Sequence, residues 1–248
     1  MYLHAACAHQ VNSTLAEIGG HMEDIAKLII ALIGSIFAYT LVRLKDWADA
    51  RRKRIEEHLN SLVICERNLT SNLMINRRNL AVIDEVIKLT SQGVMTDIYF
   101  HGYNIDWTVL GNIKNIQLVN FISNVLNRID NTNNHFAHLD SNFKTLKAEL
   151  IERNKGTQIP MDQAQSFFTV RLASAKSTRE LIITLESDIK DALAGIQVTF
   201  PGIQKKLKRW SLGYQAQFSL PPDFETLRKT RRQEIDKAIS EGGDLKWL

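Results

Sequence analysis

The chain is poor in the residues that interrupt or cross-link a polypeptide. Its 248 residues include 12 glycines, 4 prolines and 2 cysteines. Two cysteines exclude a disulfide scaffold and a thiolate metal cluster. So few glycines and prolines exclude an all-β protein, which needs many tight turns. The composition, 44% apolar and 23% charged, is that of a folded protein and excludes collagen-like and wholly disordered chains. These shortages favour an all-α protein with enough apolar residues for a core.

Recognisable catalytic motifs are also missing. The sequence has no glycine-rich phosphate loop, no G-x-S-x-G elbow, no H-E-x-x-H pair and no C-x-x-C pair. His135 and His138 are three residues apart, but two imidazoles without a third placed ligand are more simply surface histidines. We therefore expect no metal site, no cofactor and no small-molecule substrate, and we predict that the protein is not an enzyme.

The longest apolar run lies at residues 25–44. Fifteen residues from Leu28 to Val42 carry no charge, and Lys27 and Arg43 flank them. Twenty helical residues extend over about 30 Å, the thickness of the hydrocarbon core of a bilayer. Apolar residues cover the whole circumference of this helix, and a basic collar follows it at once, which favours a membrane span. A buried core helix is the alternative, because the uncharged run is shorter than eighteen residues. We predict a transmembrane helix over 25–44, after a short tail over 1–24.

Charge sets the expected orientation of this span. The first 24 residues contain no lysine or arginine, which also argues against a cleaved signal peptide. A basic collar follows the span, formed by Arg43, Lys45, Arg51, Arg52, Lys53 and Arg54. Basic residues stay on the cytoplasmic side, so the sequence predicts a single-pass protein of the bacterial inner membrane, with its N-terminus outside and its C-terminal bulk in the cytoplasm. Cys7 and Cys65 would then lie on opposite sides, and Cys65 is most simply a small buried hydrophobe.

Four small residues gather on one face of the span: Ala31, Gly34, Ser35 and Ala38. Small side chains let two membrane helices approach closely, so this face suits self-association into a homo-oligomer. Contact with lipid alone is the other interpretation.

Residues 45–202 are expected to form an antiparallel helical bundle. No glycine or proline occurs from Ser35 to Gln92. Apolar residues recur there at steps of four and three, which indicates a long helix packed as a coiled coil or within a bundle. Further helices are predicted from about Asn112 to Asn131, from about Phe136 to before Gly156, and from about Pro160 to before Pro201. The aromatic segment between Gly93 and Gly111 is expected to pack on the end of the bundle.

A series of asparagines accompanies the helix expected over 112–131. Its members are Asn120, Asn124, Asn127, Asn131 and Asn134, at steps of four and three. The series predicts either a polar lining or a solvated face, and a solvated face is the simpler interpretation.

The region 203–248 is basic. Lys205, Lys206, Lys208 and Arg209 alternate with Ile203, Leu207, Trp210 and Tyr214 at helical spacing. Three interpretations remain open: packing on the bundle, contact with an anionic membrane surface, or contact with a nucleic-acid backbone.

Arg128 and His135 resemble the Arg-x4–6-His motif of HEPN ribonucleases, which are compact helical proteins that often dimerise. The resemblance implies a membrane-tethered ribonuclease with these two residues in its catalytic centre. Such a ribonuclease is one alternative function for the chain. A structural membrane-tethered coiled-coil protein is another.

The arrangement as a whole, with one span, a basic collar and a helical domain without catalytic motifs, is similar to the transmembrane effectors of retron anti-phage systems. That resemblance implies a toxic protein that disrupts the inner membrane during abortive infection. It also implies a restraining partner, a complex of reverse transcriptase and nucleic acid.

Overall fold

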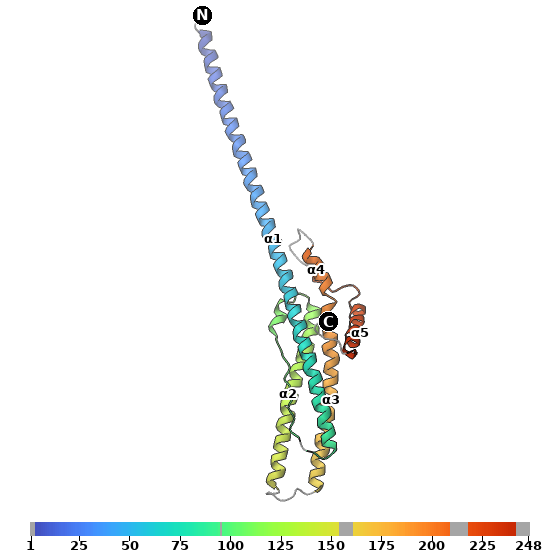
Figure 1. Cartoon of the computed structure of the whole chain (residues 1–248). Coiled ribbons are helices and arrows are strands. Elements are labelled where there is room, and N and C mark those ends of the chain that lie inside the picture. The colour runs from blue at the N-terminus through green and yellow to red at the C-terminus, as the bar shows by residue number, and fades with distance from the viewer. Residues whose placement is uncertain (1–2, 95, 154–160, 209–217, 242–248) are drawn as a thin grey trace. The chain divides into compact units, whose positions relative to one another are not determined.

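The computed structural model describes residues 3–94, 96–153, 161–208 and 218–241. Its elements are α1 (Leu3–Ser91), the 3-10 helix η1 (Thr108–Asn112), α2 (Ile116–Arg153), α3 (Met161–Gln197), α4 (Phe200–Lys208) and α5 (Phe224–Ser240) (Figure 1). No strand occurs in this described part of the chain. The all-α class is therefore confirmed.

Contacts divide the chain into two compact units. The first contains residues 1–53, and the second contains residues 54–209 together with 217–248. The division falls at Lys53, nine residues after the end of the predicted span. The described parts of the region from residue 203 onward, in α4 and α5, fall in the second unit. We call this second unit the bundle.

Helix α1 is continuous because nothing interrupts it between Gly34 and Gly93. Gly93 then ends it with a positive φ of 76°, a conformation that glycine adopts without a steric penalty. The amide of Gly93 donates to the carbonyl of Thr90 (3.0 Å), and that of Val94 donates to Leu89 (2.9 Å). These are the two hydrogen bonds of a Schellman motif.

Helix α3 runs antiparallel to both α1 and α2. Three contacts fix its direction against α1: Glu66 with Gln197, Asn76 with the carbonyl of Ile182, and Asp84 with Arg179. Two fix it against α2: Arg128 with Asp188, and His135 with Thr178. Helices α1 and α2 are consequently parallel, which an antiparallel bundle with short loops would not allow. A long crossover between them makes this arrangement possible.

That crossover is an extended segment, residues 96–114, which we call the strap. It was expected on the end of the bundle, and the structure places it along the side. Its first residue, Thr96, accepts a hydrogen bond from Arg171 of α3, and its last amide, that of Lys114, donates to Nδ1 of His58 on α1. The strap therefore travels back past the length of the bundle before α2 begins.

Helix α2 is one element where two helices were expected. The sequence between Asn131 and Phe136 is polar but holds no glycine or proline. Thr132 is 1% exposed and its hydroxyl donates to the carbonyl of Arg128 (2.8 Å), so tertiary packing outweighs the weak helix propensity of this stretch. Ile116, the first residue of the helix, is 69% exposed.

The core lies among α1, α2 and α3. Its largest fully buried side chains are Ile55, Leu62, Leu69, Leu73, Ile83, Leu118, Ile122, Ile129, Ile182, Leu185, Ile189 and Ile196. Cys65 is 3% exposed, and burial raises the pKa of its thiol to about 12. The prediction of a buried, unreactive Cys65 is thus confirmed, whereas the side chain of Cys7 lies outside the described residues.

Helix α5 docks on α3 mainly through charge. Lys190 is 9% exposed and is bonded to Glu186 (2.6 Å) and to Asp236 of α5 (2.9 Å). Arg232 reaches Asp191 (3.3 Å). Only Ile235 of α5 is buried, so apolar contact contributes little to the docking of this helix.

Candidate functional site

Within the described residues, no other part of the protein surrounds the apolar part of α1. One window of eighteen residues within Lys27–Ser91 has a mean hydropathy of 1.8, and none of it is buried. Its large side chains are between 49% and 70% exposed from Ile25 to Val42. The helix is therefore long and apolar enough to cross a membrane, and its surroundings within the chain leave its whole circumference open.

The small-residue face of this helix is exposed at all four positions. A Cβ added at Gly34 would meet no atom within 4 Å. The hydroxyl of Ser35 bonds within its own helix, to the carbonyls of Ala31 (2.7 Å) and Leu32 (3.0 Å). Ser35 therefore provides a small side chain rather than a free donor, and this face suits close packing better than polar bonding.

The collar residues Arg43, Lys45, Arg52, Lys53 and Arg54 are exposed, and Arg51 is half-buried. Arg43 donates to the hydroxyl of Tyr39 (2.9 Å), and its guanidinium lies 5.4 Å from the centre of that ring. An arginine stacked on a tyrosine at the end of an apolar helix is typical of the membrane–water interface.

Three asparagines hold the strap by its backbone, and each pairs with both the N–H and the C=O of one strap residue. Asn79 pairs with His101 (2.8 and 2.9 Å), Asn72 with Asn104 (2.8 and 2.7 Å), and Asn133 of α2 with Tyr103 (2.9 and 3.2 Å). An extended segment has no hydrogen-bonding partners of its own in an all-α protein, and the amides supply them. We call these three residues the asparagine clamps.

A fourth asparagine joins the strap to α3. Asn76 accepts from the hydroxyl of Tyr103 (2.8 Å) and donates to the carbonyl of Ile182 (3.1 Å). Asn72, Asn76 and Asn79 are each 0% exposed. Helical periodicity did not indicate that these three asparagines bind the strap and α3. The asparagine series singled out in the sequence on α2 is exposed at all five positions, so the solvated-face interpretation is confirmed.

His58 marks the other end of the strap. It is 2% exposed, and the ring of Phe218 lies edge-on at 4.7 Å. Burial, with help from the charges of Lys114 and Lys206, lowers the pKa of His58 to about 4. The imidazole is therefore neutral at pH 7, and Nδ1 accepts the amide hydrogen of Lys114 (3.2 Å).

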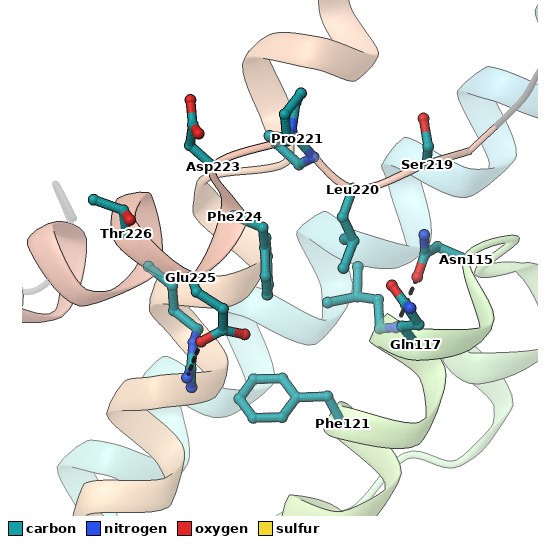
Figure 2. Close-up of a pocket in the computed structure, with 13 residues that line it drawn as sticks. Asn115, Gln117, Phe121, Ser219, Leu220, Pro221, Asp223, Phe224, Glu225 and Thr226 are labelled. Atoms are coloured by element: carbon teal, nitrogen blue, oxygen red, sulfur yellow. Dashed lines mark hydrogen bonds and ion pairs between the residues drawn. The ribbon is translucent and has the colours of Figure 1, made fainter.

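One hollow of the bundle is a cleft of about 760 Å³ (Figure 2). Phe121 of α2 faces Phe224 of α5 across it, and Leu220 and Pro221 line its upper wall. Its polar groups are largely engaged. Asn115 caps α2 through the amide of Leu118 (2.8 Å), and Glu225 pairs with Arg228 (2.7 Å). The hydroxyls of Ser219 and Thr226 and the carboxylate of Asp223 also line the cleft.

Arg128 and His135 both contact α3, and each binds a different residue there. Arg128 forms an ion pair with Asp188, and Nε2 of His135 lies 3.0 Å from the hydroxyl of Thr178. Seven helical residues separate the two along α2, which is about 10 Å of rise. Within one chain the two side chains hold helices together, and no described contact joins them into one site.

The basic C-terminal region has two different parts. On α5, Arg228, Arg231 and Arg232 are paired with acidic side chains, so they serve the bundle. On α4, Ile203 is 6% exposed and packs inward, while Lys205 and Lys208 are exposed and Lys206 is half-buried. Arg209, Trp210 and Tyr214 lie outside the described residues.

Among the described side chains, no group of three or more His, Cys, Asp or Glu residues is placed to hold a metal ion. Comparison with protein families, with curated proteins and with solved structures gave no match for the chain.

Proposed function

We propose that the chain is a single-span inner-membrane effector without catalytic activity, whose span acts on the bilayer and whose bundle receives the controlling partner. The observation that carries this proposal is the fully exposed apolar stretch of α1, which is continuous with a helix of the bundle core. Such a stretch needs lipid or other spans around it. The basic collar supports an orientation with the bundle in the cytoplasm.

Self-association supplies the activity in this proposal. One span cannot enclose a path for ions, so several chains must assemble, and the small-residue face is the surface that allows close contact. The resemblance to retron effectors suggests the control. A complex of reverse transcriptase and nucleic acid would bind the bundle, hold the spans apart and release them during phage infection.

Entry of a membrane-impermeant dye into bacteria that express the chain alone tests this proposal. Gly34→Leu adds a large side chain where the isolated chain has open space, so any effect must come from contact between chains. We expect wild type to admit dye and Gly34→Leu to admit several-fold less at equal membrane abundance.

Thr40→Leu is the matched control. Thr40 is nine residues from Ala31, which places it about 180° around the helix, and its hydroxyl bonds only to the carbonyl of Phe37 (2.8 Å). This variant should admit dye as wild type does. Equal permeability of Gly34→Leu and wild type would show that the small-residue face is not needed for dye entry. If wild type never admits dye, with or without infection, the effector proposal is wrong and the structural membrane-tethered role replaces it.

The ribonuclease alternative has its own test. Arg128→Ala or His135→Ala should leave dye entry unchanged, and purified chain should not cleave RNA. RNA cleavage that both substitutions abolish, with the bundle still folded, would replace the effector proposal with the HEPN-like one.

A further inference from the structure

Three exposed lysines gather at one end of the bundle. Lys206 of α4 lies 6.0 Å from the ring of Phe218, which contacts His58, and His58 accepts a hydrogen bond from the amide of Lys114. The start of α1 within the bundle, the end of the strap and α4 therefore meet here. We call the exposed lysines of this place, Lys114, Lys205 and Lys208, the basic end.

Acidic groups do not neutralise the basic end. No aspartate or glutamate occurs in the sequence between Asp191 and Asp223, a stretch that holds four basic residues. Within the described residues, Lys114, Lys205 and Lys208 take part in no ion pair. The nearest acidic residues along α1, Glu56 and Glu57, are half-buried. The lowered pKa of His58 agrees with this, because both charges acting on the ring come from lysines.

The opposite end of the bundle is different. Three lysines there are matched by carboxylates: Lys88 with Glu85 (4.0 Å), Lys144 with Asp140 (2.6 Å) and Lys147 with Asp97 (3.6 Å). These pairs reduce the attraction of the three lysines for an anionic surface, whereas no described ion pair does so for the lysines of the basic end.

Chain connectivity brings the basic end close to the membrane. The bundle begins at Arg54, ten residues after Leu44 at the end of the span. Ten residues extend over about 15 Å as a helix and over no more than about 35 Å in any conformation. His58 follows Arg54 by one helical turn, so the basic end is the end of the bundle that is tethered to the bilayer.

We propose that the basic end docks on anionic phospholipid headgroups and draws the bundle onto the membrane surface. Lys114, Lys205 and Lys208 supply the contacts, with Ile203 anchoring α4 to the core so that its lysines face outward. The inference needs the span to be in a membrane, but it does not need the span to permeabilise one.

The test uses the full chain in vesicles of phosphatidylcholine, with or without phosphatidylglycerol. A fluorophore is attached at Ser219→Cys in a Cys7→Ser background, where the buried thiol of Cys65 stays unlabelled because its pKa is about 12. Lipids with a nitroxide on the headgroup report docking by quenching. We expect strong quenching with phosphatidylglycerol at low salt, and its loss in phosphatidylcholine alone or at high salt.

Substitution then assigns the docking to the basic end. The triple variant Lys114→Gln, Lys205→Gln, Lys208→Gln should weaken the docking equilibrium by about fivefold for each lysine removed. The same positions changed to Arg should keep it. Lys88→Gln, Lys176→Gln and Lys229→Gln together remove the same charge elsewhere and should leave quenching unchanged.

Three results would overturn the proposal. The first is quenching that does not depend on phosphatidylglycerol or salt, and the second is an equal effect of the two triple variants. The third is binding of an RNA or DNA duplex to the chain in phosphatidylcholine vesicles that the Lys114, Lys205, Lys208 variant abolishes, because the surface would then recognise nucleic acid. Failure of the span itself is distinguishable, since the chain would then not float with vesicles of any composition.

Discussion

The two parts of helix α1 differ in what they bury. From Ile25 to Val42 its large apolar side chains are exposed, whereas from Arg54 to Ser91 it buries asparagines and a histidine beside its leucines. Among the described residues the first part has no packing partner, and it is long and apolar enough to cross a membrane. In the second part, polar side chains of α1 supply the hydrogen bonds that the backbone of the strap needs. The two parts of this helix thus suit different environments, and the distribution of polar residues along α1 distinguishes them.

The largest contrast between the parts is expected for leucine truncation. Leu62 is 0% exposed in the core, so Leu62→Ala should lower the free energy of unfolding of the bundle by about 3–5 kcal/mol. Leu28 is 70% exposed, and Leu28→Ala should leave the same transition unchanged. Urea unfolding of the chain in detergent micelles measures both. Similar losses for the two variants would mean that the apolar stretch packs against the bundle.

Acid should destabilise the bundle through His58. Its pKa is about 4 in the folded chain, below the ordinary value of 6.5, so between these values the unfolded state binds a proton that the folded state does not. Stability is therefore full above pH 6.5, falls by about 1.4 kcal/mol per pH unit below it, and has lost roughly 3 kcal/mol near pH 4.

Unfolding in urea across this pH range tests the linkage. His58→Gln keeps a group that can accept from the amide of Lys114 but cannot titrate, so its profile should be flatter. The exposed His138 supplies the control, because His138→Gln should retain the wild-type slope. A slope that survives in His58→Gln would assign the acid sensitivity to other groups.

Removal of one asparagine clamp should have a smaller effect. Asn79→Ala deprives the N–H and C=O of His101 of their partners, and two lost hydrogen bonds correspond to about 2 kcal/mol. Hydrogen exchange at the amide of His101 should rise at the same time. Asn124→Ala, at an exposed position of α2, should change stability by less than about 0.5 kcal/mol. Equal stability of the two variants would contradict the clamping role.

The docking of α5 should be the least sensitive. Burial raises the pKa of Asp236, but its bonds to Lys190 and Arg232 outweigh this and lower the pKa below 3.8. The ion pairs are present at neutral pH and are lost as the pH falls through that lowered value. Because the side chain of Asp236 is 45% exposed, Asp236→Asn should cost less than about 1 kcal/mol by urea unfolding. A loss as large as that of Leu62→Ala would show that α5 belongs to the core.

The apolar stretch, the all-α class and the position of α3 could be predicted from the sequence. Periodicity and the scarcity of glycine and proline are local signals, and they identify long helices well. The strap was not predictable in this way. Its stability comes from Asn72, Asn79 and Asn133, which lie 22 to 32 residues from the backbone groups they bind. Asparagine on a helix carries no sign of such a partner.

The same limit applies to the candidate site residues. The spacing of Arg128 and His135 matched a catalytic motif, but a spacing does not show that Asp188 and Thr178 face them from α3. The basic residues after Ile203 looked alike in the sequence. Acidic neighbours on α3 engage those of α5, while those of α4 lie in a stretch without any carboxylate. The sequence shows the missing carboxylates around α4, but only the tertiary arrangement shows the α3 partners of α5.

The central claim is that the apolar part of α1 spans the membrane with the bundle in the cytoplasm. Fusions of alkaline phosphatase and of green fluorescent protein to the C-terminus, each expressed in bacteria and followed by alkaline extraction of the membranes, test it most directly. The account predicts an inactive phosphatase, a fluorescent fusion and a chain that stays in the extracted membranes. An active phosphatase at the C-terminus, or a chain that alkaline extraction releases, would contradict it.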